Sequence, residues 1–272
     1  MKRVKRRVRD LAHRVVTSGT VSTDLNRYER EFVQWTADRQ GVSTESALER
    51  YVQARSTVRG GFGGGEWRWL CEVNHDALRP IFGDDNPDEV IAAYRHHAPA
   101  HLLRMLSYRT PRWVGEVTER LGGRARIVDY GCGLAHGSLA VAESLQRAGV
   151  DVHLTVVDLP TIKLDFLTWM LERTQIAYTV IEGGAKPAPI DEWDLLVATE
   201  FFEHVHDPVG FFEALDRTSA PGAIMVAAID DHAAEFMHVS PDLADLRAAV
   251  AERYDSSDEL HFRRRVTRRS TR

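Results

Sequence analysis

The chain has 272 residues, of which 43% are hydrophobic and 28% charged, ordinary values for a globular protein with a sizeable core. No run of about 18 apolar residues occurs and the N-terminus lacks a secretory signal, so we expect no membrane span and a cytoplasmic location. Two cysteines, Cys71 and Cys132, exclude a disulfide framework and a cysteine metal cluster. Only four of the 35 basic residues are lysine, which indicates a GC-rich bacterial genome.

The charge is unevenly distributed along the chain. Residues 1–16 and 263–272 each carry a net charge of +6, so the remaining body carries −17. Basic ends can bind nucleic acid or an anionic membrane. The acidic body argues against nucleic acid as the main substrate, because phosphate contacts dominate such binding. Apolar residues at helical spacing within 1–16 favour a helix that docks on its own domain.

Residues 1–118 show helical patterns and predict a cap region. Leu25, Tyr28, Phe32 and Trp35 share one helical face, with Ser22 and Thr23 as candidate caps. Further helices are predicted after Asn86 and after Thr110.

A glycine-rich segment, 59–65, interrupts these helices in the stretch RGGFGGGEWRW. Five glycines in seven residues exclude a stable helix interior. The segment is interpreted either as a flexible linker or as a mobile lid carrying Phe62, Trp67 and Trp69.

From residue 119 onward, apolar strands alternate with helices. The predicted strands span 125–130, 152–158, 177–183, 193–199 and 222–230, and helices are predicted between most of them. This alternation predicts an α/β fold with a parallel, doubly wound sheet. Ligands of such sheets bind beyond the carboxyl ends of the strands.

The stretch RIVDYGCGLAHGSLAVAESL contains a glycine-rich turn between a strand and a helix. The dinucleotide pattern G-x-G-x-x-G fails, because His136 stands where the third glycine belongs. The phosphate loop pattern fails as well, since no Lys-Ser or Lys-Thr follows. An acidic residue, Asp129, and three small residues remain: Gly131, Gly133 and Ala135.

This pattern resembles motif I of the class I S-adenosylmethionine-dependent methyltransferases. Asp158 ends the second strand, where that family places an acidic residue for the ribose hydroxyls. Glu203, His204, Asp207 and Pro208 resemble its E-H-x-x-D-P run, and SAPGAIMVA and ELHFRRRV resemble its last strands. The resemblance covers about residues 112–268. It implies a Rossmann-like, mostly parallel seven-stranded sheet with helices on both faces, preceded by a helical cap over 1–118.

The resemblance also implies S-adenosyl-L-methionine as cofactor, bound by the domain over 119–272. The cofactor-binding residues carried over are Asp129, Gly131, Cys132, Gly133, Ala135, Asp158, Leu159, Glu182, Gly183, Thr199, Glu200 and Phe201. Two departures concern the adenine side: Glu182 replaces the usual Asp, and a short link with two prolines replaces most or all of a crossover helix. The adenine contact is therefore left open among Glu182, Gly183 and Gly184.

The catalytic residues are less specified by the sequence. Candidate bases are His204, His206 and His232, although His204 matches a family position that is often structural. Further options are Asp230, Asp231 and His238, whose stretch IDDHAAEFMH also has residues of metal-ligand type. Because acidic pairs after strands are commonly solvated, we expect no metal. We expect His96, His97 and His101 to lie at the surface.

The function expected is methyl transfer to an oxygen or nitrogen of a small-molecule acceptor, preferably a specialised metabolite. Candidate aromatic walls for the acceptor are Trp113, Phe201, Phe202, Trp67 and Trp69. Two alternatives stay open: an enzyme of the same fold that cyclises or cleaves S-adenosylmethionine without methylating, and a binding protein that docks through its basic ends. No nucleic-acid partner is expected, and a homodimer is left open.

Overall fold

The computed structural model describes residues 25–57, 91–92, 100–231, 238–256 and 261–265. Within these ranges, no helix is long and apolar enough to cross a membrane. Several sequence-based predictions lie outside the described residues: the helix over 1–16 and most of the basic C-terminal end, the glycine-rich segment 59–65, the helix after Asn86, and the side chains Trp67, Trp69, His96, His97 and His232.

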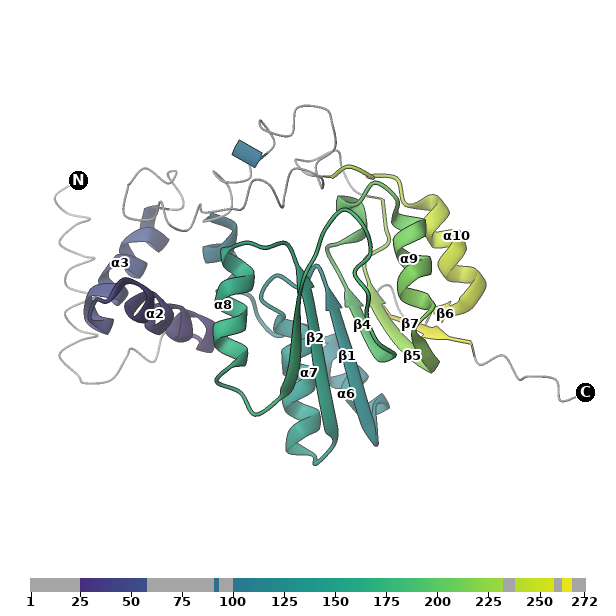
Figure 1. The fold of residues 1–272 in the computed structure, drawn as a ribbon, viewed down its shortest axis with the longest axis horizontal. Helices are drawn as coiled ribbons and strands as arrows, with labels where there is room; N and C mark the ends of the chain where they lie inside the picture. Colours follow the sequence, from purple (N-terminus) through teal and green to yellow (C-terminus); the bar gives the residue numbers. More distant parts are fainter. Residues whose placement is uncertain (1–24, 58–90, 93–99, 232–237, 257–260, 266–272) are drawn as a thin grey trace, which may run out of the picture.

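A seven-stranded sheet forms the centre of the fold, in the order β3-β2-β1-β4-β5-β7-β6 (Figure 1). The strands are β1 (Arg124–Tyr130), β2 (Asp151–Asp158), β3 (Ala177–Glu182), β4 (Trp193–Ala198), β5 (Ser219–Ala227), β6 (Tyr254–Ser256) and β7 (His261–Arg264). The first five pair in parallel, whereas β7 is antiparallel to β5 and to β6. The predicted fold class is confirmed, including the closing hairpin. Strand order reverses between β1 and β4, which is where ligands bind in such sheets.

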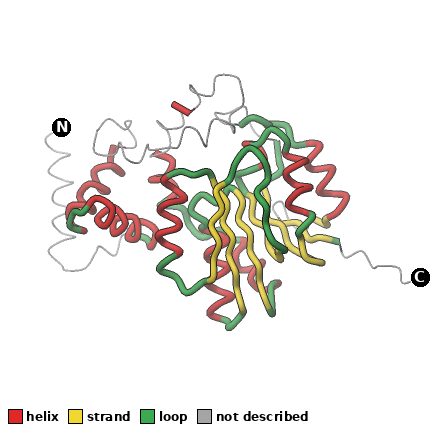
Figure 2. Tube along the Cα trace, in the orientation of Figure 1, coloured by secondary structure: helices red, strands yellow, loops and turns green. Residues whose placement is uncertain are grey.

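Helices cover both faces of the sheet, as the tube in Figure 2 shows. Alternate strand residues face opposite sides, so that Ile127 and Leu195 belong to one hydrophobic cluster and Val128 and Leu196 to another. On the sheet, the helices of the first cluster are α6 (Trp113–Arg120), α7 (His136–Arg147) and α8 (Ile162–Leu171), and residues of the N-terminal helices described below join the same cluster. Those of the second cluster are α9 (Pro208–Asp216) and α10 (Ala244–Arg253).

The link between β3 and β4, residues 183–192, is described throughout and contains no helix. The hydroxyl of Tyr130, at the end of β1, accepts a hydrogen bond of 2.9 Å from the backbone N–H of Ala188. This bond holds the link over the sheet end. The prediction of a missing crossover helix is confirmed.

Of the two N-terminal helices, α2 (Arg27–Gln40) lies beside α8 in Figure 1, and α3 (Thr44–Thr57) packs on α2. The cap of α2 is Asn26, which forms a capping box with Glu29, so neither predicted cap residue, Ser22 or Thr23, starts this helix. The helix docks through aromatic contacts: Phe32 meets Phe166 of α8 edge to face, with ring centroids 5.5 Å apart.

A second contact joins α2 to α7, where the ring of Tyr28 stacks on His136 with centroids 3.9 Å apart. The Arg27 guanidinium also pairs with the Glu143 carboxylate of α7. The described part of the cap is thus packed on the sheet-covering helices. The boundary predicted between residues 118 and 119 falls inside α6 and stays a prediction.

Candidate functional site

The glycine-rich turn reverses the chain between β1 and α7. Gly131, Gly133 and Ala135 all adopt left-handed backbone conformations, with φ of 71°, 53° and 52°. Such values cost an L-residue roughly 1–2 kcal/mol and glycine little, which explains two of the three residue types. The backbone N–H groups of Gly131 and Cys132 donate to the Val157 carbonyl at 2.8 and 3.2 Å. The turn is therefore held against the end of β2.

The carboxylate of Asp158 connects this turn to β2. One oxygen accepts the Gly133 N–H at 2.6 Å and the other accepts the Leu159 N–H at 2.7 Å. A carboxylate offers about four acceptor sites, so lone pairs remain for further donors. Asp158 is 8% exposed and faces the cavity described below. It can therefore accept two hydroxyl groups of a ligand, as the resemblance implies for a ribose.

The carboxyl group of Asp129 lies in the interior, at the end of β1. Burial raises its pKa to about 7, the negative charge of Asp158 adds to the increase, and the hydrogen bond from the Ser138 hydroxyl opposes it. This carboxyl group therefore changes its charge near neutral pH. A cation bound nearby would favour its ionised form. Burial also raises the pKa of the neighbouring Cys132 thiol well above its ordinary value, so this thiol stays protonated and unreactive.

A cavity of about 510 Å³ lies at the carboxyl ends of β1, β2 and β4. This volume is within the roughly 300–1,000 Å³ of small-molecule sites. Ten of the twelve predicted cofactor-binding residues line it: Asp129, Gly131, Cys132, Gly133, Asp158, Leu159, Gly183, Thr199, Glu200 and Phe201. Ala135 instead is buried at the start of α7, and Glu182 is exposed at the end of β3, while Gly184 joins the cavity wall.

The predicted bases separate in the structure. His204 lines the cavity, whereas His206 is exposed and is not among the lining residues that the structure describes. Of the predicted aromatic walls, Trp113 and Phe201 line the cavity. Phe202 is a correction to the prediction: it is fully buried in the hydrophobic cluster that also holds Phe211 and Phe212 of α9, so it is packed away from the cavity.

Several lining residues were not predicted as site residues. They are Arg104, Met105, Tyr108, Arg109, Pro111, His136, Gly137 and Lys163. His101 also lines the cavity, and it is exposed, as the sequence predicted. Most come from a helical turn over 100–105 and the segment after it, which crosses the glycine-rich turn. A Cβ on Gly133 would stand 2.1 Å from the Met105 methyl group. No motif marks these positions, since only tertiary packing brings them to the sheet end.

Two of these unpredicted residues, Lys163 and His136, bring ionisable side chains to the cavity wall. Lys163, on the first turn of α8, is 8% exposed and places a cation at the cavity wall. Burial lowers the pKa of His136 to about 4, so its imidazole is neutral at pH 7. The cavity thus has both carboxylates and cations, which suits a ligand with charges of both signs.

A glycine in α7 makes room for an aromatic wall of the cavity. A Cβ on Gly137 would stand 2.3 Å from the Trp113 indole, a rigid neighbour. Gly137→Ala is therefore expected to lower the free energy of unfolding by roughly 1–3 kcal/mol through overpacking. In α6, Gly115 has nothing within 4 Å of such a Cβ, so Gly115→Ala should raise it by up to roughly 1 kcal/mol. Urea unfolding of both variants checks this, and equal stabilisation would contradict the contact.

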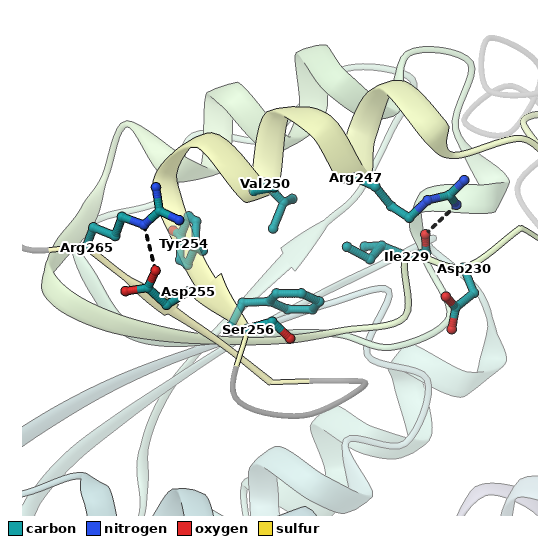
Figure 3. Close-up of a pocket in the computed structure, with 10 residues that line it drawn as sticks. Ile229, Asp230, Arg247, Val250, Tyr254, Asp255, Ser256 and Arg265 are labelled. Atoms are coloured by element: carbon teal, nitrogen blue, oxygen red, sulfur yellow. Dashed lines mark hydrogen bonds and ion pairs between the residues drawn. The ribbon is translucent and has the colours of Figure 1, made fainter.

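A second cavity, of about 450 Å³, lies between α10 and the β6–β7 hairpin (Figure 3). Its floor is apolar, with Ile229, Val250 and Tyr254. Its two arginines are engaged: Arg265 with the Asp255 carboxylate at 2.7 Å, and Arg247 with the Ile229 carbonyl at 3.0 Å. It has none of the predicted cofactor-binding residues. We therefore take the cavity of about 510 Å³ as the functional site and call it the main cavity.

Comparisons with known proteins identify the family of this chain. The sequence profile of the methyltransferase domain family matches residues 94–263. A ubiquinone biosynthesis O-methyltransferase of Salmonella newport is 33% identical over 117 residues, which are 41% of this chain and 46% of that relative. The chain thus matches less than half the length of this curated relative.

Solved structures with a similar chain trace were also found. One is an S-adenosylmethionine-dependent methyltransferase of Aquifex aeolicus, with 11% identity and a TM-score of 0.46 over 62% of this chain and 98% of that one. Another, from Methanosarcina mazei, has 12% identity and a TM-score of 0.43 over 56% of this chain and 98% of that one.

Proposed function

This chain belongs to the methyltransferase domain family, and we propose that it transfers a methyl group from S-adenosyl-L-methionine to an oxygen or nitrogen of a small molecule. The observation that carries the proposal is Asp158, whose carboxylate joins the glycine-rich turn to β2 at the edge of the main cavity. We further propose a specialised metabolite as acceptor, since the body of the chain is acidic and does not favour nucleic acid.

The described residues fit this cofactor in charge and shape. Asp158 has acceptor sites left for ribose hydroxyls, and Asp129 becomes ionised beside a bound cation such as the cofactor's ammonium group. The turn at Gly131 and Gly133 offers a surface without side chains for the methionine part. Gly183 and Gly184 border the cavity on the adenine side. When bound, the cofactor supplies an activated methyl group on a sulfonium.

The chain's own residues contribute positioning and exclusion of water. Trp113, Phe201 and Tyr108 give the cavity aromatic surface, which desolvates the acceptor and aligns it for displacement at the methyl carbon. His204 reaches the same cavity from the turn after β4. We propose that it acts on the acceptor, and its neighbours, described in the next subsection, indicate how.

The cofactor is tested by calorimetric titration of the protein with S-adenosylhomocysteine, with NADH as control. We expect binding of the first compound alone. Incubation with S-adenosylmethionine and a panel of hydroxyl- and amine-bearing acceptors should then yield S-adenosylhomocysteine and a methylated product. Release of methylthioadenosine instead would overturn methyl transfer in favour of a cleaving or cyclising enzyme. Absence of binding, with acceptors present as well, would contradict the cofactor.

Replacing His204 is expected to affect catalysis and leave cofactor binding intact. His204→Gln should lower kcat by roughly 10²–10⁴-fold, the usual contribution of a group that activates the nucleophile. Its affinity for S-adenosylhomocysteine should stay within about twofold, since the side chain lies on the acceptor side. The control is His153→Gln, at the opposite end of β2, where the imidazole contacts the Thr179 hydroxyl at 2.9 Å. Equal kcat values for both variants would remove His204 from the mechanism.

We propose a cytoplasmic location, which is supported by Cys132, a buried free thiol in the described part of the chain. We also propose a homodimer, which light scattering tests, and docking of the basic ends on a membrane, which vesicle sedimentation tests.

A further inference from the structure

Three side chains with metal-ligating atoms converge between the turn after β4 and the segment after β5. Glu203 and His204 belong to η2 (Phe202–His204), and His238 precedes α10 in the chain. One ligand atom from each of the three lies within 4.8 Å of the other two. Among the described residues, these three form a cluster of the composition that metal ions prefer.

Two hydrogen bonds from Ser240 hold the two segments together. The Ser240 N–H donates to the Glu203 carbonyl at 3.1 Å, and the Ser240 hydroxyl donates to the Val205 carbonyl at 2.7 Å. The rings of His204 and His238 consequently lie 5.0 Å apart, centroid to centroid. These bonds fix the relative position of the two main-chain segments that carry the three side chains.

The charge of the cluster also favours a cation. The Glu203 side chain is fully buried, and one of its carboxylate oxygens lies 3.8 Å from Nε2 of His204. Two imidazoles and one carboxylate make the ligand set that binds Zn²⁺ and related ions while leaving coordination positions open. Ligand atoms roughly 2.0–2.2 Å from an ion need only small side-chain shifts from the present spacing.

We propose that Glu203, His204 and His238 bind a divalent transition-metal cation at the wall of the main cavity. His204 is the member of the cluster that lines this cavity, so the open coordination positions face the acceptor. The sequence alone predicts no metal here, because acidic pairs after strands are commonly solvated. Asp231 forms an ion pair with Arg247 at 2.7 Å. The cluster of metal-ligating side chains instead contains Glu203, from the turn after β4.

The consequence for the substrate rests on the proposed methyl transfer. A cation at this position would bind an acceptor hydroxyl and make its proton easier to lose. The proton leaves to solvent, an oxygen lone pair forms the new bond to the methyl carbon, and the carbon–sulfur bond breaks with its electron pair remaining on sulfur. The site therefore selects hydroxyl acceptors, and oxygen rather than nitrogen becomes the methylated atom.

The test uses the full chain, stripped with a chelator and titrated with Co²⁺ and Zn²⁺. We expect one equivalent of Co²⁺ to give visible absorption bands, which Zn²⁺ abolishes by competition. Glu203→Gln and His238→Gln should each weaken binding at least about 100-fold, which corresponds to about 2.8 kcal/mol of binding free energy. The matched controls His153→Gln and Glu119→Gln, on β2 and α6, should keep the wild-type affinity.

A second measurement needs no substitution. In ¹⁵N spectra of histidine side chains, Zn²⁺ should shift two of the chain's twelve imidazoles in the wild-type protein. No binding of either ion, or binding unchanged in both cluster variants, would overturn the cation site. A protein that binds the cation through these residues and transfers no methyl group would contradict the proposed function alone. Methyl transfer that persists after complete removal of metal would contradict the role in acceptor activation.

Discussion

Asp158→Asn is expected to weaken the binding of S-adenosylhomocysteine by at least about 100-fold. The wild-type carboxylate can accept two ribose hydroxyls, and a hydrogen bond to a charged group is worth roughly 1.5–3 kcal/mol. The variant loses the charge and gains an amide N–H₂, which cannot accept a donor. That N–H₂ also faces one of the two backbone N–H groups that the carboxylate now binds, Gly133 or Leu159. Calorimetric titration measures the loss directly.

The matched control for this variant is Asp151→Asn, at the other end of the same strand. Asp151 is exposed and lies 3.8 Å from Arg124, a contact worth little at the surface. This variant should bind S-adenosylhomocysteine as the wild type does. Thermal melting of both variants without ligand separates loss of affinity from loss of folding. A folded Asp158→Asn variant with wild-type affinity would exclude Asp158 as the ribose residue.

The strands and the cavity wall formed by their carboxyl ends could be predicted because their signals are local. The apolar run of β1 is followed by Asp129 and then by two closely spaced glycines, a pattern that predicts a tight turn after a strand. Parallel pairing then brings the ends of β1, β2 and β4 to one edge, so residues far apart in sequence meet there. Ten of the twelve predicted residues line the cavity for this reason.

The two residues that do not line the cavity show where this reasoning stops. Ala135 occupies a small position of the motif, but its left-handed conformation starts α7 and turns the side chain into the core. Glu182 ends β3 in register with Asp158, yet β3 lies at the sheet edge and its last side chain is exposed. Facing direction depends on the backbone conformation at each position, which the residue type alone does not specify.

The cavity wall formed by the helices and by the segment after residue 100 was largely unpredictable from sequence. Met105 and Tyr108 follow ordinary helical and turn patterns, and they reach the cavity only because their segment packs across the glycine-rich turn. Most residues of α8 around Lys163 are apolar, so the sequence shows no polar face of this helix that would predict Lys163 at the cavity. His204 and His238 are separated along the chain and meet through the hydrogen bonds of Ser240. Such contacts are tertiary in origin.

Asp129→Asn is expected to stabilise the ligand-free protein above pH 7 while weakening cofactor binding. The pKa of Asp129 is raised from 3.8 to about 7 in the folded state, chiefly by burial. Between these values the folded protein holds more protons than the unfolded chain, so this group makes the free energy of unfolding fall as pH rises. Above pH 7 the cost is complete and amounts to up to roughly 4 kcal/mol, which a neutral Asn avoids. The Asn oxygen can still accept from Ser138.

The measurement is the difference in free energy of unfolding between Asp129→Asn and the wild type, from urea titrations at several pH values from 4 to 8. The difference removes the contribution of His136, whose lowered pKa acts in the opposite direction between pH 4 and 6.5. The variant should gain stability relative to the wild type as pH rises, with a plateau above 7. Wild-type affinity for S-adenosylhomocysteine should rise up to tenfold per pH unit below 7, because the ligand's ammonium requires the ionised carboxylate, and the variant's affinity should be lower and flat. A stability difference independent of pH would show that Asp129 is ionised throughout, and the buried carboxyl would then need a cationic partner already present in the folded chain.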